Sequence, residues 1–363
     1  MKIGILGSRG IPNRYGGFEE CAQQLGTRWA ARGHEVYVYN SHQHPYPHKE
    51  YKGVSLIHKY DPEHRLGTAG QFVYDFNSLM DAHWRDFDIL LMLGYTSSSV
   101  WRWVFPRKPV IITNMDGLEW KRSKYSRRVQ KFLKRAERWA ANASDVLIAD
   151  AKEIQQYLND KYHRGAVYIP YGSETFKAVD DSILKKYGLE PYQYNLVVAR
   201  LEPENNLEII LQGIQKSESQ RVLLVVGNHE TSYGEYLKNT FKDSRIRFVK
   251  ASFKKQTINN LRYFSHLYFH GHTVGGTNPS LLEAMGCKCV ICAHDNPFNR
   301  EVLEEDGNYF LDVNDVVNAV DHLERNSVQQ QKIKNNLEKL KTRYNWDIVA
   351  EQYEVVFQQA LIR

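Results

Sequence analysis

Short apolar runs alternate with amphipathic stretches along the whole chain. Each run has the length and the β-branched content of a buried strand. Strands separated by helices form parallel sheets, so the pattern predicts an α/β protein. The predicted strands are residues 2–6, 35–39, 54–58, 89–93, 110–113, 146–149, 167–169, 194–198, 221–226, 246–249, 267–269, 289–292 and 309–311.

A single hydrophobic core does not usually extend over a chain of 363 residues, so two domains are expected. The pattern breaks over residues 170–191, where Pro-Tyr-Gly and a short helical piece are typical of a linker. We expect a first domain at 1–172, a second at 173–345 and a terminal helix at 346–363. Both domains are predicted to be Rossmann-like, with the active site in the cleft between them.

The composition excludes several classes of protein. No apolar run approaches the roughly 20 residues of a membrane-spanning helix, and the start MKIGILGSRG is typical of a strand and a turn rather than a signal peptide. Three of the four cysteines form CKCVIC, whose spacing argues against zinc and whose context favours reduced thiols in the cytosol. We expect no metal and no cofactor. The net charge of +6 is modest, so its placement matters more than its size.

The segment HGHTVGGTNPSLLEAM is the strongest functional signal. Gly275 and Gly276 let the backbone approach a ligand, and Asn278 with Pro279 predicts a capped helix start. Such a start directs N–H groups and the positive end of the helix dipole at one point, where a phosphate would bind. Glu283, about one turn on, suits a pair of sugar hydroxyls such as those of a ribose. An ordinary capped helix is the alternative.

Further donor-side residues follow other strands of the second domain. Arg200 would emerge at the carboxyl end of the strand at 194–198, and a planar, permanently charged guanidinium suits a diphosphate. Lys250 and Ala251 follow another strand, where backbone groups would hold a base. His272 lies at the mouth of the site, either as a donor contact or as a structural residue.

A long loop, GSRGIPNRYGGFEE, follows the first strand. Gly7 and Gly10 do not have the spacing G-x-G-x-x-G, and the second strand ends in Asn40 rather than an acid, so an NAD enzyme is not expected. The length of the loop favours a ligand site over a plain connection. The predicted contacts are Gly16 and Gly17 for the donor, and Arg9, Arg14, Tyr15 and Glu19 for the acceptor.

These motifs resemble those of a known family. ARLEPENN, GGTNPSLLEAMG and the terminal WDIVAEQYEVVF are similar to segments of the GT-B glycosyltransferases of the large retaining family four, and the resemblance covers nearly the whole chain. GSRGIPNRYGGFEE and DGLEWKR resemble a bacterial subgroup that includes rhamnosyltransferases of cell-wall and capsular polysaccharides. The resemblance implies two Rossmann-like domains facing across a cleft, with the C-terminal helix packed on the first. It also implies metal-independent transfer with retention from a sugar nucleotide held by the second domain to an acceptor held by the first.

Two positions depart from the family pattern. Asn205 stands where many members have a lysine of the diphosphate clamp. Gly275 stands where many have the first of two glutamates, and Glu283 matches the second. A deoxysugar donor needs fewer polar contacts, which fits the missing acid. The expected donor contacts also include Thr277, Asn278 and Ser280, whose amides, together with a catalytic Arg200, would stabilise the leaving diphosphate.

The segment NMDGLEWKR follows a buried strand of the first domain and would bring Asp116 and Glu119 to the cleft as candidate catalytic residues. Related enzymes often have a histidine-containing segment here. An acid accepts or holds the proton of an acceptor hydroxyl. Because the leaving phosphate can itself be the base in a retaining enzyme, Asp116 is interpreted as a positioning residue, and a helix-capping aspartate is the alternative. The predicted acceptor contacts here are Trp120, Lys121 and Arg122.

From Lys121 to Arg138 the chain is rich in lysine and arginine, with apolar residues at helical spacing, and Glu137 is the one acid. The pattern predicts a basic amphipathic helix that docks on an anionic cytoplasmic membrane face, where a lipid-linked acceptor is reached. A helix packed on its own domain with a solvated basic side is the alternative. Nucleic acid is not expected as a partner, because the aromatic residues form a core stripe.

The sequence therefore predicts a cytoplasmic hexosyltransferase, peripheral at the inner face of the membrane. It would move a sugar from a dTDP- or UDP-sugar, with L-rhamnose from dTDP-rhamnose as the leading candidate, onto a lipid-linked saccharide in polysaccharide biosynthesis. The alternatives are a nucleotide-sugar epimerase of the same two-domain architecture, which would act without an acceptor, and a membrane-bound sensor of sugar nucleotides.

Overall fold

The computed structural model describes residues 1–122, 124–250 and 254–362. The chain divides into two compact units, which we describe one at a time. Unit 1 comprises Met1–Lys121, Tyr125–Tyr171 and Trp346–Arg363, and unit 2 comprises Arg122–Lys124 and Gly172–Asn345.

An eight-stranded sheet forms the centre of unit 1, in the order β3-β4-β2-β1-β5-β6-β7-β8. Every neighbouring pair is parallel except β3 with β4. All positions of β5 are buried, as expected for a parallel strand covered on both faces. The strands are β1 (Lys2–Leu6), β2 (Glu35–Ser41), β3 (Glu50–Tyr51), β4 (Val54–Lys59), β5 (Ile89–Leu93), β6 (Val110–Asn114), β7 (Val146–Ala149) and β8 (Val167–Tyr168).

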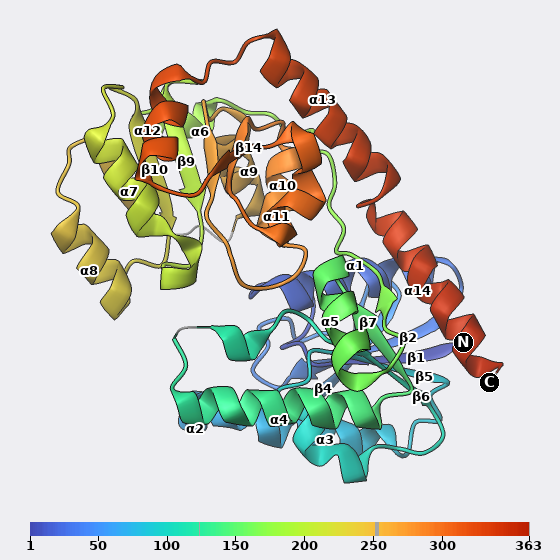
Figure 1. Ribbon diagram of the computed structural model, residues 1–363. Coiled ribbons are helices and arrows are strands. Elements are labelled where there is room, and N and C mark those ends of the chain that lie inside the picture. Colours follow the sequence, from blue (N-terminus) through green and yellow to red (C-terminus); the bar gives the residue numbers. More distant parts are fainter. Residues whose placement is uncertain (123, 251–253, 363) are drawn as a thin grey trace. The chain divides into compact units, whose positions relative to one another are not determined.

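Helices cover the sheet of unit 1, and α14 lies beside α1 although the two are far apart in sequence (Figure 1). Trp29 is fully buried there, and its Nε1 donates to the carbonyl of Ala350 at 3.1 Å. The expected return of the C-terminal helix to the N-terminal region is confirmed. The helices are α1 (Gly17–Ala31), α2 (Glu63–Leu66), α3 (Gly70–Ala82), α4 (Arg127–Ala143), α5 (Lys152–Tyr162) and α14 (Trp346–Leu361), with the 3-10 turns η1 (Gly67–Ala69), η2 (Ser98–Val104) and η3 (Glu119–Lys121).

Unit 2 is built on a six-stranded parallel sheet in the order β11-β10-β9-β12-β13-β14. Its core includes Leu211, Leu223 and Phe269, which are fully buried. The strands are β9 (Tyr194–Val198), β10 (Val222–Gly227), β11 (Ile246–Lys250), β12 (Tyr268–His270), β13 (Ile291–His294) and β14 (Asn308–Phe310). The helices are α6 (Ser182–Lys185), α7 (Leu207–Lys216), α8 (Ser232–Thr240), α9 (Lys255–Tyr263), α10 (Pro279–Gly286), α11 (Pro297–Leu303), α12 (Val313–His322) and α13 (Ser327–Thr342), with the turns η4 (Pro203–Asn205) and η5 (Glu304–Asp306).

The predicted α/β class with two parallel sheets is confirmed. Each predicted strand is present, with ends that move by up to two residues, and β3 was not predicted because it has only two residues at the edge of the sheet.

One expectation about a helix boundary was wrong. The basic helix α4 begins at Arg127 rather than Lys121, because the Ser126 hydroxyl accepts from the amide of Val129 and ends the turn that precedes it. The chain passes from unit 1 to unit 2 between Tyr171 and Gly172, within the segment 170–191 that the sequence marks as a linker, and the amide of Phe176 donates to the carbonyl of Gly286 at 3.0 Å within unit 2.

The strand orders place a topological switch point in each unit. In unit 1 the order reverses between β1 and β5, and in unit 2 it reverses between β9 and β12. Ligands of open parallel sheets bind at the carboxyl ends of the strands that flank such a point. The loops after these four strands are therefore the first place to look for a site.

Candidate active site

The loops after β9 and β12 are fastened to each other in unit 2. Asn206 Nδ2 donates to the carbonyl of Gly271 at 2.7 Å, and the amide and hydroxyl of Thr273 donate to the carbonyl of Glu204 at 3.1 and 2.9 Å. A Cβ at Gly271 would lie 1.9 Å from the carbonyl oxygen of Asn205, so only glycine permits this approach. The two loops act as one surface at the switch point.

Arg200 and Asn205 lie on the first of these loops. Arg200 is exposed, and its guanidinium makes no hydrogen bond or ion pair with the residues that the structure describes. Asn205 Nδ2 donates to the carbonyl of Arg200 at 2.7 Å, and its Oδ1 accepts from Nδ1 of His272 at 2.9 Å. Asn205 thus ties the two loops together, whereas Arg200 offers a positive charge to a ligand.

His272 and Gly275 face each other on the second loop. Burial, together with the charges of Arg122 and Arg200, lowers the pKa of His272 to about 4, so its imidazole is neutral at physiological pH. Gly275 has φ +134°, and a Cβ there would lie 3.0 Å from Nε2 of His272. The positive φ favours glycine at this position, and a Cβ would also be in tight contact with the histidine ring.

Helix α10 begins as the sequence predicts. The side chain of Asn278 accepts from the amide of Ser280 at 2.9 Å, and Pro279 occupies the first helical position. The Ser280 hydroxyl lies 2.8 Å from Nη2 of Arg262 and 2.9 Å from the hydroxyl of Tyr268. Since the amide and hydroxyl of Ser280 are engaged within unit 2, the loop before the cap is left to offer N–H groups to an anion.

Glu283 does not stand alone on α10. Its Oε2 lies 2.6 Å from Nη1 of Arg262, its Oε1 lies 3.8 Å from Nζ of Lys255, and its side chain is 26% exposed. Sequence reasoning missed Arg262, because a single arginine in the amphipathic helix α9 carries no motif. The sequence offers one weak signal, since a buried arginine needs an acidic partner.

Two further residues that were expected to contact the donor are Lys250 and Thr277. Lys250 follows β11, and its Nζ lies 2.9 Å from Glu230 at the surface, so a contact with a base would come from its backbone. Thr277 is buried just before the cap. Ala251 lies outside the described residues.

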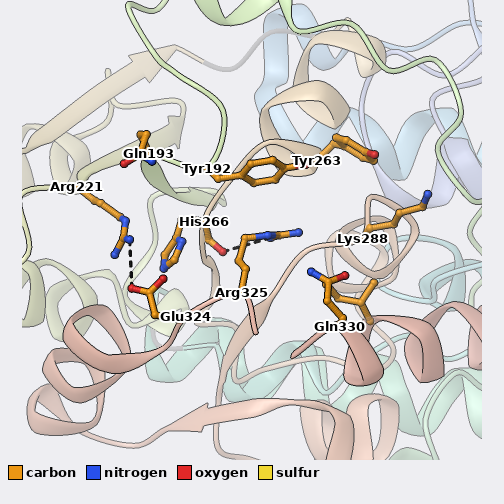
Figure 2. Close-up of a pocket in the computed structure, with 10 residues that line it drawn as sticks. Tyr192, Gln193, Arg221, Tyr263, His266, Lys288, Glu324, Arg325 and Gln330 are labelled. Carbon is orange, nitrogen blue, oxygen red and sulfur yellow. Dashed lines mark hydrogen bonds and ion pairs between the residues drawn. The ribbon is translucent and has the colours of Figure 1, made fainter. Parts of the chain in front are cut away.

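A cavity of about 600 Å³ lies at the opposite edge of the same sheet, at the amino ends of the strands. Nη2 of Arg221 donates to Oε1 of Glu324 at 3.2 Å. Figure 2 shows this pair, with Arg325 turned toward the backbone of the His266 loop. The Arg325 guanidinium donates to the carbonyl of Ser265 at 3.1 Å. Because Arg221 and Arg325 already have partners within the protein and parallel sheets bind ligands at the other edge, we assign no ligand to this cavity.

In unit 1, Arg9 and Glu19 fix the loop that follows β1. The Arg9 guanidinium donates to both carboxylate oxygens of Glu63, at 2.8 and 2.6 Å, and this pairing raises the pKa of Arg9. The amide of Arg9 donates to Glu19 Oε1 at 2.8 Å. Both side chains predicted to bind an acceptor therefore stabilise the loop itself.

The far end of this loop is open to a ligand. Helix α1 begins at Gly17 after Gly16, and no described side chain caps it. Arg14 and Tyr15 are exposed at the tip of the loop. At the base, a Cβ at Gly10, which has φ +118°, would lie 2.5 Å from Oδ1 of Asn40. Asn40, at the position where an NAD enzyme would have a ribose-binding acid, holds the loop instead, because its side chain bonds to both the amide and the carbonyl of Ile11, at 3.1 and 2.8 Å.

Asp116 lies in a fixed turn after β6. Its φ is +51°, and its amide donates to Oδ1 of Asn114 at 2.9 Å. An aspartate tolerates this left-handed conformation, which is a form of backbone strain often found at functional sites. Glu119 follows in the half-buried turn η3.

The other residues of the DGLEWKR segment are held by neighbours. Trp120 Nε1 donates to Oε2 of the buried Glu137 at 2.8 Å, and Nζ of Lys134 lies 4.2 Å from the centre of its ring. Lys121 is exposed. Arg122 belongs to unit 2, where its Nη1 lies 3.6 Å from Glu204.

A buried carboxyl that the sequence did not reveal lies at the switch point of unit 1. Burial raises the pKa of Asp75 on α3 to about 7, although the hydroxyl of Ser97 donates to it at 2.5 Å. The adjacent Tyr74 donates its hydroxyl to the carbonyl of Ser8 at 3.1 Å. Asp75 therefore lies beside the loops that follow β1 and β5.

Other signals in the sequence give no site. The four cysteines are buried thiols. Across the described ranges, no group of three or more histidine, cysteine, aspartate or glutamate side chains is arranged to hold a metal ion. No helix in the same ranges is both long and apolar enough to cross a bilayer. His44, in the segment HQHPYPH, is 5% exposed and its Nε2 lies 3.2 Å from the carbonyl of Pro12, so it is held within unit 1.

Comparison with protein families divides the chain at nearly the same place as the structure. Residues 179–340 match the family described as glycosyl transferases group 1. Residues 1–174 match a domain family of unknown function, DUF1972. No curated protein matches the chain in sequence.

Solved structures share the whole architecture at low sequence identity. Sucrose-phosphate synthase from Thermosynechococcus elongatus has a TM-score of 0.78 at 17% identity, covering 99% of this chain and 98% of that one. HepE of Anabaena in complex with UDP-glucose has a TM-score of 0.76 at 16% identity, covering 98% and 99%. An α,α-trehalose-phosphate synthase from Burkholderia xenovorans has a TM-score of 0.70 at 11% identity, covering 99% and 100%. These likenesses show the GT-B fold.

Proposed function

We propose that this chain, which carries a group 1 glycosyltransferase domain in the GT-B fold, transfers L-rhamnose from dTDP-rhamnose, with retention, onto a lipid-linked saccharide. The observation that carries the proposal is the joined pair of loops at the switch point of unit 2. They present the unpaired guanidinium of Arg200, and the Gly275–Gly276 turn that leads into the capped helix α10. The choice of rhamnose rests on the resemblance of GSRGIPNRYGGFEE and DGLEWKR to the rhamnosyl subgroup.

The donor is proposed to bind to unit 2. The guanidinium of Arg200 and the N–H groups of Gly275 and Gly276 would neutralise the leaving diphosphate without a metal ion. Glu283 would accept a hydrogen bond from the 3′-hydroxyl of the deoxyribose in dTDP, or from both hydroxyls of the ribose if the donor is a UDP-sugar. HepE, which has the same fold, is seen with UDP-glucose, and this supports a nucleotide sugar as the donor class.

The acceptor is proposed to bind to unit 1. Asp116, held in its turn by Asn114, would orient the attacking hydroxyl, and the leaving phosphate would take the proton. The exposed Arg14 and Tyr15 would contact the acceptor. The amino end of α1 at Gly16–Gly17 would supply further N–H groups to the donor.

A lipid-linked acceptor requires contact with a membrane, and α4 is proposed to provide it at the cytoplasmic face. Arg128, Lys131 and Arg135 are exposed along one side of this helix. Trp103 on η2 is 66% exposed, and the Arg102 guanidinium lies between Trp103 and Trp139 of α4, at 5.0 and 4.8 Å from the two rings. A cationic helix beside an exposed tryptophan is typical of surfaces that bind anionic bilayers.

Donor turnover in variants of unit 2 tests the proposal. Arg200→Ala should lower kcat by roughly 100-fold or more, because a positive charge that stabilises the leaving group is lost. Glu283→Gln should raise the KM for the donor. Arg247→Ala and Glu190→Gln are matched controls on the exposed surface of unit 2 and should leave turnover unchanged. Unchanged turnover in both site variants would refute the assignment.

The choice of donor and of reaction type is tested on the wild-type chain. A thermal-shift panel of dTDP-, UDP- and GDP-sugars identifies the donor, since a specific ligand raises the unfolding temperature by mass action. An epimerised sugar nucleotide formed without acceptor would favour the epimerase, and tight donor binding without any product would favour the sensor.

A further inference from the structure

Arg262 is a deeply buried charged residue beside the proposed donor site. It lies in the last turn of α9, and its side chain is 3% exposed. Its Nη1 donates to Oε2 of Glu283 at 2.6 Å, and its Nη2 donates to Oγ of Ser280 at 2.8 Å. Since residues three apart lie on one face of a helix, one guanidinium holds two side chains of α10 in register.

The guanidinium is itself held from the other side. Its Nη1 also donates to Oδ1 of Asn259 at 3.0 Å, and its Cζ lies 5.8 Å from the centre of the Tyr268 ring. The hydroxyl of Tyr268 lies 2.9 Å from Oγ of Ser280, which closes the cluster. Burial is the largest single influence on Arg262 and lowers its pKa, but Glu283, Tyr268 and the nearby cysteines together outweigh it, so the pKa of Arg262 is raised. The guanidinium therefore stays charged and fixed.

We propose that Arg262 is a positioning residue of the donor site, which aims the carboxylate of Glu283 at the hydroxyls of the nucleotide's sugar ring. The inference rests on the proposed function, because it assumes that Glu283 contacts that ring. Oε2 of Glu283 is committed to Arg262. Oε1 has Nζ of Lys255 at 3.8 Å, which is beyond hydrogen-bond distance, and the side chain is still 26% exposed, so a ligand hydroxyl can reach the carboxylate.

A purely structural role does not account for this arrangement equally well. A buried ion pair is often no more stabilising than apolar side chains of the same volume. The pair instead fixes the orientation of the carboxylate, because the planar guanidinium of an arginine sets both its position and its rotation. On α10, this fixed carboxylate lies one turn after the loop that is proposed to bind the diphosphate.

The test compares two ligands that differ only at the sugar ring. Isothermal titration measures the affinity of each variant for UDP or dTDP, whichever the wild-type chain binds more tightly, and for the 2′,3′-dideoxy form of the same nucleotide. The wild type should prefer the hydroxylated form by about tenfold or more, since a hydrogen bond to a charged group is lost in the other. Glu283→Gln should remove most of that preference.

Arg262→Lys should reduce the preference at least threefold, with little change in affinity for the dideoxy nucleotide, because lysine keeps the charge but cannot hold Glu283 and Ser280 together. Ser280→Ala removes only the contact between Arg262 and Ser280, so it should reduce the preference for the hydroxylated nucleotide by a smaller factor. This variant provides the test if Arg262→Lys does not fold. In turnover, both variants should raise the donor KM more than they lower kcat.

Ser265→Ala is the matched control. The Ser265 hydroxyl donates to the backbone carbonyl of Arg262 at 2.7 Å and does not touch the guanidinium, so this variant should lose stability without losing the preference. Equal weakening of both nucleotides by Arg262→Lys, or no change in the preference, would overturn the inference and leave the proposed function standing. A wild type that binds both nucleotides equally, or neither, would overturn the role of Glu283 as well.

Discussion

Asn114 and Tyr353 are 239 residues apart, and the side-chain amide of Asn114 donates to the hydroxyl of Tyr353 at 3.0 Å. The other side of the Asn114 amide accepts from the backbone of Asp116 at 2.9 Å. The C-terminal helix therefore supports the turn that carries the proposed acceptor-orienting residue.

Tyr353→Phe should disturb this turn. The buried amide of Asn114 loses its acceptor, so we expect a loss of about 1–3 kcal/mol in stability and a fall in kcat, because small displacements of reacting groups are costly. Thermal unfolding and steady-state kinetics measure the two effects. Phe357→Leu, on the same helix, should lower stability without changing kcat. A Tyr353→Phe enzyme with wild-type kcat would contradict this relationship.

Asn205→Ala should weaken donor binding through His272. Without the amide, the imidazole loses its hydrogen bond, and the loops after β9 and β12 lose a link between them. We expect a loss of about 1 kcal/mol in donor affinity for Asn205→Ala and a coupling energy of at least about 0.5 kcal/mol with His272→Ala in a double-mutant cycle. Additive effects of the two substitutions would show that the residues act independently.

Gly275→Ala should be more harmful than an ordinary glycine substitution. A side chain at φ +134° is strained, and its Cβ would press on His272 Nε2. We expect a loss of about 1–3 kcal/mol in stability together with weaker donor binding. Gly165→Ala is the control, because a Cβ there meets no atom within 4 Å, and it should leave the unfolding temperature unchanged or slightly higher.

Replacing Arg128, Lys131 and Arg135 by glutamine should release the chain from anionic membranes. Each cation near a charged bilayer contributes about 1 kcal/mol, so the triple variant should bind phosphatidylglycerol vesicles roughly 100-fold more weakly. Co-sedimentation with phosphatidylglycerol and with phosphatidylcholine vesicles measures the effect. The control variant, with the same change in net charge on unit 2, replaces Lys185, Lys242 and Lys334. Equal loss in both triple variants would mean that net charge, not α4, drives the binding.

Asp75 should make the stability of unit 1 depend on pH. Its folded pKa of about 7 lies above the ordinary value of 3.8, so the folded chain holds a proton that the unfolded chain releases. The contribution of Asp75 to stability is then largest below pH 4, declines by up to about 4 kcal/mol as the pH rises from 4 to 7, and stays constant above that. Asp75→Asn should remove this contribution, which is measured as the difference in unfolding temperature between variant and wild type from pH 4.5 to 8. A difference that does not change with pH would contradict the assignment.

Periodicity was sufficient to predict the architecture, because buried parallel strands are continuous apolar runs that the sequence displays directly. The capped start of α10 was also predictable, since Asn278 and Pro279 act on their immediate neighbours. The part of the site that depends on partners far apart in the chain could not be predicted. The engagement of Arg9 with Glu63 and of Ser280 with Arg262 is set by packing between elements far apart in the chain, and no local pattern records it.

The same limit explains why Asn205 and Gly275 looked like two separate losses in the sequence. The structure places His272 between them, held by one and given room by the other. A substitution pattern of this kind is understandable only once the third residue is known.

The position of α14 also bears on how the chain folds as it is made. Unit 1 takes its last helix from the end of the chain, whereas unit 2 lies almost entirely within Gly172–Asn345. Because synthesis starts at the amino end, the residues of unit 2 are made before those of α14, and the face of α1 around Trp29 has no partner helix until α14 is made. The nascent chain therefore offers chaperones an apolar surface late in synthesis, and a chain that stops before α14 keeps that surface exposed.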